Sequence, residues 1–161
     1  MRIGITGHQR LADPARWGWV KQEINRVLSS AERPLIGVSS LAIGADQLFA
    51  DAVLQYDGAL EVVIPFVGYE FAFSEGHDRE EYFRYLESAS KQEVLEKHGS
   101  DDEAYLAAGL RLVDRSELLV AVWDGRPASG LGGTGDVVNY ALEQGKRIIH
   151  LNPNTQEVNQ L

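Results

Sequence analysis

Five short apolar runs, separated by segments with helical periodicity, limit the folds open to this chain more than any other feature. Each run is apolar almost throughout rather than alternating, which is typical of strands covered on both faces. Repeated strand–helix–strand units favour parallel pairing with right-handed crossovers. The sequence therefore predicts a three-layer α/β fold with a mainly parallel five-stranded sheet, in the order 3-2-1-4-5. The runs are Arg2–Thr6, Leu35–Ser39, Leu60–Pro65, Leu118–Trp123 and Arg147–Leu151.

The segments between these runs predict the covering helices. Asp13 fits an N-cap with Pro14 at the first helical position, and Asp57-Gly58 and Gly145 mark two helix ends. The stretch from Gly68 to Arg115 is harder to assign. Its helical segments are 78–89 and 102–115, and Gln92–Glu96 between them is either a helix end or a sixth strand.

Length and composition predict one domain without a membrane segment. The 161 residues suit a single core, which we expect over residues 1–153, followed by a polar tail over residues 154–161. Without cysteine there is no disulfide, and the reducing cytoplasm is the default compartment. The chain enters a strand-like run at once, and no apolar run approaches the ~20 residues that span a bilayer. We therefore expect a cytoplasmic protein with no signal peptide and no membrane partner.

The charge balance is acidic. Asp and Glu number 24 against 15 Lys and Arg, a formal net charge of −9. Such a chain repels nucleic-acid phosphate at long range, so the sequence predicts no nucleic-acid partner. A small anionic ligand stays compatible with this charge, because backbone N–H groups hold phosphate without a charged side chain.

Polar residues follow several of the predicted strands. Ligands of open α/β sheets bind beyond the carboxyl ends of the strands, where the strand order reverses, so these residues are candidate ligand contacts. A histidine close to an arginine suits phosphate recognition. Turn formation, helix capping or ordinary surface polarity is the alternative for each. The candidates are Thr6, Gly7, His8 and Arg10 after the first run, Ser39, Ser40, Gly44 and Asp46 after the second, and Asp124 after the fourth.

The glycine-rich run Gly130–Asp136 carries the most information. Glycines before a helix allow close backbone approach to a ligand, and the helix start adds roughly half a positive charge. We predict a phosphate there, with a capped surface turn as the alternative. The predicted contacts are Gly132, Gly133, Thr134, Gly135 and Asp136.

The sequence lacks the motifs of several kinds of binding site. Neither the dinucleotide fingerprint G-x-G-x-x-G nor the P-loop is present, so a nicotinamide-dependent dehydrogenase and a P-loop NTPase are not expected. The histidines are scattered and no H-x-x-x-H pair occurs, so we predict no metal and no cofactor.

Five segments taken together resemble the SLOG superfamily, Rossmann-like domains akin to the LOG and DNA-processing-protein-A proteins. They occur in order from Gly4 to Pro153. The resemblance implies recognition of a nucleotide or nucleotide-derived ligand by a sensor or carrier, with phosphate at the glycine-rich helix start. The segments are GITGHQRL (Gly4–Leu11), SSLAIGADQLFA (Ser39–Ala50), VIPF (Val63–Phe66), VDRSELLVAVWDG (Val113–Gly125) and GGTGDVVNYA (Gly132–Ala141).

The chain departs from the LOG enzymes, which hydrolyse the N-glycosidic bond of nucleoside monophosphates, at one position. Their motif P-G-G-x-G-T-x-x-E ends in a glutamate, where this chain has Asn139 or Val137, depending on the alignment. Neither is a carboxylate that could serve glycosidic cleavage. A binding protein is the leading interpretation. The alternative is an N-glycosidase that uses an aspartate instead, with Asp46, Asp124 and Asp136 as candidate catalytic residues, and the third is a DNA-processing module, which the net charge disfavours.

Related domains often pair, so a homodimer or higher homo-oligomer is a further expectation. The helix over residues 102–115 offers apolar side chains that either contact another copy or cover the sheet. These are Tyr105, Leu106, Leu110 and Val113.

Overall fold

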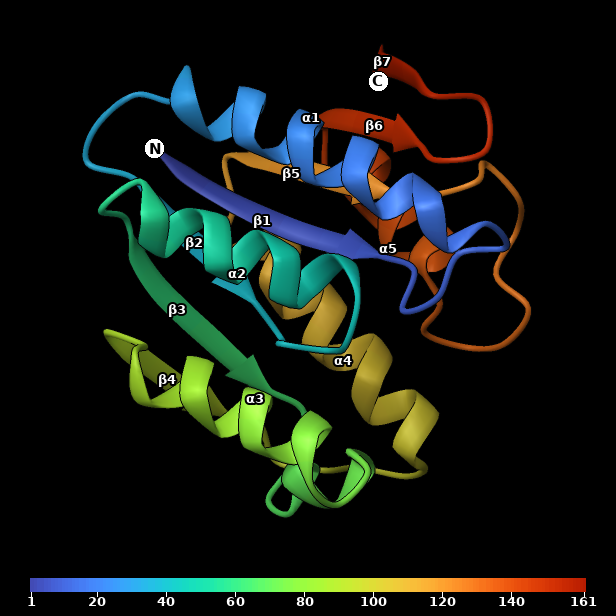
Figure 1. Ribbon diagram of the computed structural model, residues 1–161. Helices are drawn as coiled ribbons and strands as arrows, with labels where there is room; N and C mark the ends of the chain where they lie inside the picture. The colour runs from blue at the N-terminus through green and yellow to red at the C-terminus, as the bar shows by residue number, and fades with distance from the viewer.

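The computed structural model describes residues 1–161 and contains one seven-stranded sheet between two layers of helices (Figure 1). The strand order is β4-β3-β2-β1-β5-β6-β7, and every neighbouring pair is parallel except β6 and β7. The α/β class and the mainly parallel sheet are confirmed. The strands are β1 (Arg2–Gly7), β2 (Ile36–Ser39), β3 (Ala59–Ile64), β4 (Lys91–Val94), β5 (Leu118–Val122), β6 (Arg147–Asn152) and β7 (Glu157–Gln160).

The α-helices cover both faces of the sheet in two groups, as Figure 1 shows. The first group is α1 (Trp17–Ser29), α2 (Ala45–Gln55) and α3 (His77–Glu87), and the second is α4 (Asp101–Asp114) and α5 (Thr134–Glu143). Two short 3-10 helices, η1 (Pro14–Arg16) and η2 (Tyr69–Ala72), precede α1 and α3. Asp13 caps η1 by accepting the Ala15 N–H at 3.0 Å, so the predicted helix start is a 3-10 turn that leads into α1. No helix has the length and apolar character needed to cross a bilayer.

The five predicted strands lie in the predicted order, but the sheet has one more strand at each edge. β4 overlaps Gln92–Glu96, for which a sixth strand was one of the two alternatives, whereas β7 was not predicted. The five apolar runs are the inner strands, in which β3, β2, β1, β5 and β6 are successive neighbours. β4 and β7 add one strand at each edge, and β7 lies within the segment expected to be a polar tail. Their sequences, KQEV and EVNQ, lack an apolar run because an edge strand pairs on one side only and stays largely exposed.

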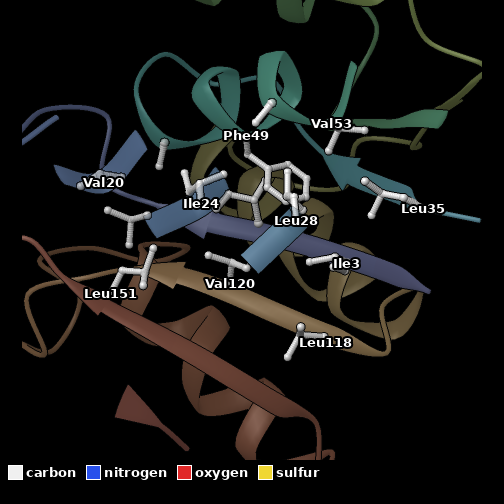
Figure 2. Packing of buried hydrophobic residues seen from close by; sticks show 14 residues of the cluster. Ile3, Val20, Ile24, Leu28, Leu35, Phe49, Val53, Leu118, Val120 and Leu151 are labelled. Carbon is white, nitrogen blue, oxygen red and sulfur yellow. The ribbon is translucent and has the colours of Figure 1, made fainter. Parts of the chain in front are cut away.

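One cluster of the core lies between the sheet and helices α1 and α2 (Figure 2). Ile24 and Leu28 of α1 and Phe49 of α2 are fully or almost fully buried on the β1 and β5 side chains. On the opposite face, Leu112 and Val113 of α4 pack with α5 on the sheet. Val113 therefore covers the sheet, whereas Tyr105, Leu106 and Leu110 are half-buried.

A buried carboxylate connects α4 to the sheet. Glu61 of β3 is only 6% exposed, and its Oε2 accepts Arg2 Nη1 at 2.8 Å and Arg115 Nη2 at 2.5 Å. Arg115 also donates to Glu93 of β4 at 2.8 Å. Because the Arg115 guanidinium is itself almost buried, it depends on both carboxylates for compensation of its charge.

Replacing Glu61 by glutamine should lower the free energy of unfolding by about 2 kcal/mol, because Arg115 loses one of its two carboxylate partners. Urea unfolding of the purified variant measures the change. Glu87→Gln is the matched control, since Glu87 is exposed and forms no ion pair. Equal effects of the two substitutions would contradict a role for the Glu61 network in stability.

Candidate ligand-binding cleft

A cleft of about 770 Å³ opens at the carboxyl ends of the central strands. The loops after β1, β2 and β5 line it together with η2, part of α4 and the start of α5. This volume lies within the ~300–1,000 Å³ typical of small-molecule sites. The predicted residues that line it are Thr6, Gly7, His8, Arg10, Ser40, Asp46, Asp124, Gly132, Gly133, Thr134 and Gly135, whereas Ser39, Gly44 and Asp136 do not.

Gly44 joins two of the loops instead of lining the cleft. Its φ is +87°, and a Cβ there would lie 2.7 Å from the His8 carbonyl oxygen and 2.6 Å from that of Gln9. The next residue, Ala45, donates its backbone N–H to the His8 carbonyl at 3.2 Å. Gly44 thus allows the loop after β1 to pack directly on the start of α2.

Ser39 and Asp46 hold the turn between β2 and α2. Ser39 is fully buried, and its Oγ accepts the Leu41 N–H at 3.0 Å and donates to the Asp46 carbonyl at 3.3 Å. The Asp46 carboxylate accepts the Ala42 N–H at 3.3 Å. Leu41 has a φ of +59°, a conformation that a non-glycine residue keeps only when its surroundings enforce it. These hydrogen bonds enforce it, so Ser39 has a structural role and does not reach the cleft.

Burial changes the ionisation of Asp46. Removal from water raises the pKa of its carboxyl to about 7, against the lowering effect of hydrogen bonds from the Ala42 and Ser40 backbones. Asp46 is 7% exposed and lines the cleft. Asp46 therefore carries a proton in a substantial fraction of molecules at neutral pH.

Asp124 and His8 form a second anchored pair. The Asp124 backbone N–H donates to His8 Nε2 at 3.2 Å, which places the imidazole proton of the neutral ring on Nδ1. The Asp124 carboxylate accepts the Arg126 N–H at 2.9 Å and lies 3.6 Å from His8 Nε2. This is the geometry of an Asx turn, which was the alternative interpretation of Asp124.

The glycine-rich loop packs on the segment that precedes it. A Cβ at Gly133 would lie 2.8 Å from Ala128 Cβ, and one at Gly135 would lie 2.9 Å from the Ala128 nitrogen. Asp136 Oδ2 accepts the Gly132 N–H at 3.0 Å and closes the loop. These glycines therefore serve close packing of the chain on itself, a reason for glycine that does not involve a ligand.

The start of α5 keeps free donors all the same. Gly133 is its N-cap and supplies no side-chain cap, and the backbone N–H groups of Thr134 and Gly135 have no acceptor in the protein. Both residues line the cleft. Unpaired N–H groups at a helix N-terminus favour an anion.

The three candidate catalytic acids share one property. Asp46, Asp124 and Asp136 each accept a backbone N–H from their own loop, from Ala42, Arg126 and Gly132. Each carboxylate thus has a structural partner. No group of three or more histidine, aspartate and glutamate side chains is placed to hold a metal ion.

The two arginines of the cleft have no such partners. Arg10 and Arg126 form no ion pair and no side-chain hydrogen bond, although both line the cleft. Most of the other arginines form ion pairs with carboxylates, among them Arg2, Arg26 and Arg115. In a protein with a net charge of −9, two free guanidinium groups beside one cleft are available to an anionic ligand.

The sequence interpretation missed the aromatic and polar wall on the side of η2 and α4. Only the tertiary arrangement places these side chains at the cleft. Trp123, the last residue of the fourth predicted strand, also lines it and donates Nε1–H to the Arg126 carbonyl at 2.8 Å. The missed lining residues include Phe73, Ser74, Asp78, Tyr105 and Arg126.

Substituting Gly44 by alanine should lower the thermal midpoint by several degrees, because the positive φ and the two carbonyl oxygens oppose a Cβ. Gly18→Ala, in α1 with open space around the added Cβ, should instead raise stability by about 0.5–1 kcal/mol. Thermal unfolding of both variants measures the contrast, and a neutral Gly44→Ala would contradict the described loop contact.

The stability contributed by Asp46 should depend on pH. Because the folded protein holds this proton more tightly than the unfolded chain, the contribution is complete below about pH 4 and is lost as pH rises towards about 7. Asp46→Asn carries no charge and lacks this decline. The loss of thermal midpoint caused by Asp46→Asn should therefore be smaller at about pH 8 than at about pH 5. A loss that is the same at both pH values would show that the pKa of the Asp46 carboxyl is not raised in the folded protein.

No family model matches the chain, and a search of curated proteins likewise found no match. Solved structures do match. DNA processing protein A (DprA) from Streptococcus pneumoniae superimposes with a TM-score of 0.62 at 17% identity, over 92% of this chain and 49% of that one. DprA from Helicobacter pylori, described for its single-stranded DNA binding mode, gives 0.62 at 13% identity, over 93% and 64%. This chain therefore spans about half of the first protein and less than two thirds of the second.

A molybdenum cofactor (Moco) carrier protein from Chlamydomonas is also similar. Its TM-score is 0.55 at 16% identity, over 94% of this chain and 75% of that protein. The family resemblance of the five sequence segments implied a Rossmann-like domain, the fold that these neighbours share.

The prediction that this chain has no nucleic-acid partner is contradicted by the DprA neighbours, because the Helicobacter pylori protein binds single-stranded DNA. Net charge averages over the whole surface, whereas contact with nucleic acid depends on where the cations lie. A net charge of −9 therefore does not exclude such a partner.

At these identities the comparison establishes architecture and not activity. This chain shares the α/β fold of the DprA and Moco carrier structures.

Proposed function

We propose that this protein binds a phosphorylated small molecule of the nucleotide class in the cleft, as a sensor or carrier, with the phosphate at the start of α5. One observation carries the proposal. Arg10 and Arg126 are unpaired beside the same cleft in which the N–H groups of Thr134 and Gly135 lack acceptors. Guanidinium groups and free helix-start N–H groups are both donors that phosphate accepts.

The surrounding geometry supports a preformed site. The Asp124 turn and the Trp123 side chain hold the segment that carries Arg126, and Gly44 joins the Arg10 loop to α2. Little of the backbone then needs to be ordered when a ligand arrives, which reduces the entropic cost of binding.

The similarity to the Moco carrier protein supports a carrier role for this fold. The alternative, an N-glycosidase with an aspartate in place of glutamate, has weaker support, because the three candidate carboxylates already accept hydrogen bonds from the backbone of their own loops.

Titration calorimetry with AMP tests the proposal. Arg10→Ala and Arg126→Ala should each weaken binding by about tenfold, because each removes a charged donor to the phosphate. Arg147→Ala is the matched control, since Arg147 is also unpaired but lies at the opposite end of the sheet, where it lines a separate pocket. Unchanged affinity in both cleft variants would refute the phosphate site.

Two further probes separate the competing functions. Chromatography of AMP after incubation would reveal released adenine if the protein were an N-glycosidase. A single-stranded oligonucleotide, included because one DprA neighbour binds such DNA, tests the nucleic-acid alternative. Binding of the oligonucleotide without binding of AMP would replace the small-molecule proposal.

A further inference from the structure

The Tyr69 hydroxyl is an unpartnered polar group directed at the cleft. Tyr69 is 5% exposed and lines the cleft, yet its hydroxyl makes no hydrogen bond within the protein. No fully buried side-chain nitrogen or oxygen lacks a partner, so this oxygen keeps contact with solvent, and the cleft is the opening that Tyr69 lines. A side chain that is otherwise buried thus offers only its polar end to a ligand.

Four aromatic neighbours hold the Tyr69 ring in place. They approach it edge-on or nearly so, at centroid distances between 5.2 and 6.2 Å. Edge-to-face contacts are the favoured geometry of aromatic pairs. The hydroxyl is therefore in a fixed position before any ligand binds. The four neighbours are Phe66, Phe73, Tyr82 and Tyr105.

This hydroxyl acts as a donor. Burial, followed by the negative charge of Asp46, raises the pKa of Tyr69 well above its ordinary value, so the phenol keeps its proton. An O–H group without a partner requires an acceptor atom on the ligand.

Tyr105 of α4 adds an aromatic surface beside it. Its side chain is half-buried, lines the cleft and lies 6.2 Å from Tyr69 and 5.8 Å from Phe66, centroid to centroid. Lys97 lies over the Phe66 ring at 4.9 Å. A half-exposed ring at a cleft wall provides a face on which a flat ligand ring can stack.

We propose that Tyr69 and Tyr105 form a subsite for a nitrogen heterocycle, so that the ligand is a heteroaromatic nucleotide and not a sugar phosphate. The Tyr69 hydroxyl donates to a ring nitrogen or exocyclic oxygen, and Tyr105 stacks on the ring. This inference rests on the proposed function, because it takes the phosphate to lie at the start of α5 in the same cleft.

The two ends of the cleft have different chemistry. The loops after β1 and β5 and the start of α5 offer cationic and N–H donors, whereas η2 and α4 offer aromatic rings and the Tyr69 hydroxyl. A phosphate alone leaves the aromatic end unused. A nucleotide satisfies both, since it carries an anion at one end and a flat ring with acceptor atoms at the other.

Calorimetric titration with AMP and with ribose 5-phosphate, which lacks the ring, tests the subsite. The unmodified protein should bind AMP at least about tenfold more tightly than ribose 5-phosphate. Tyr69→Phe removes one oxygen and keeps the ring packing, and it should lower this affinity ratio about fivefold. Tyr105→Ala should lower the ratio by about tenfold through loss of stacking.

Tyr82→Phe is the matched control. Tyr82 belongs to the same aromatic cluster and stacks on Phe73 at 4.5 Å, but it does not line the cleft. The affinity ratio of this variant should equal that of the unmodified protein. Thermal unfolding of each variant checks that the aromatic cluster stays folded.

The outcomes distinguish the subsite from the proposed function. Equal affinities for AMP and ribose 5-phosphate, or a ratio that neither cleft tyrosine variant lowers, would overturn the subsite while phosphate binding still stood. Failure of both compounds to bind would overturn the proposed function and this inference with it.

Discussion

The pairing of β1 with two parallel neighbours is the constraint on which the rest of the structure depends. β1 pairs with β2 on one side and β5 on the other, so the chain leaves the sheet centre in both directions. The loops after β1, β2 and β5 diverge there, and the cleft opens between them. The buried apolar side chains of both sheet faces keep this strand in place, so the position of the cleft follows from core packing.

The carboxylates of the cleft loops serve mainly to shape the backbone. Asp46, Asp124 and Asp136 each accept an N–H group from a neighbouring turn, whereas Arg10 and Arg126 stay unpaired. An acidic protein can in this way present free cations and free N–H donors at one edge. These three acids are already engaged with the backbone, so the local chemistry of the cleft differs from the average given by the net charge.

The inner sheet and three cleft loops could be predicted because each depends on a local pattern. Buried parallel strands need continuous apolar runs, and a loop beyond a strand's carboxyl end lies at the ligand edge in any open sheet. The roles of Ser39, Gly44 and Asp136 could not be predicted, because a hydroxyl, a glycine or a carboxylate suits a ligand and a turn equally well. Their neighbours in space decide between the two, as the Ala128 contact does for Gly133.

The sequence by itself determined the α/β class, the inner strands with their neighbours and the edge of the sheet that carries the cleft. These depend on apolar periodicity and on the handedness of crossovers, which are local properties of the chain. Only the tertiary structure decided between a helix end and a strand at β4, added β7, and placed Tyr69 and Tyr105 in one wall of the cleft. An edge strand forms through hydrogen bonds to one neighbouring strand only, so it needs no apolar run in its sequence. A half-buried tyrosine becomes a cleft residue only when segments distant in sequence, here η2 and α4, come together.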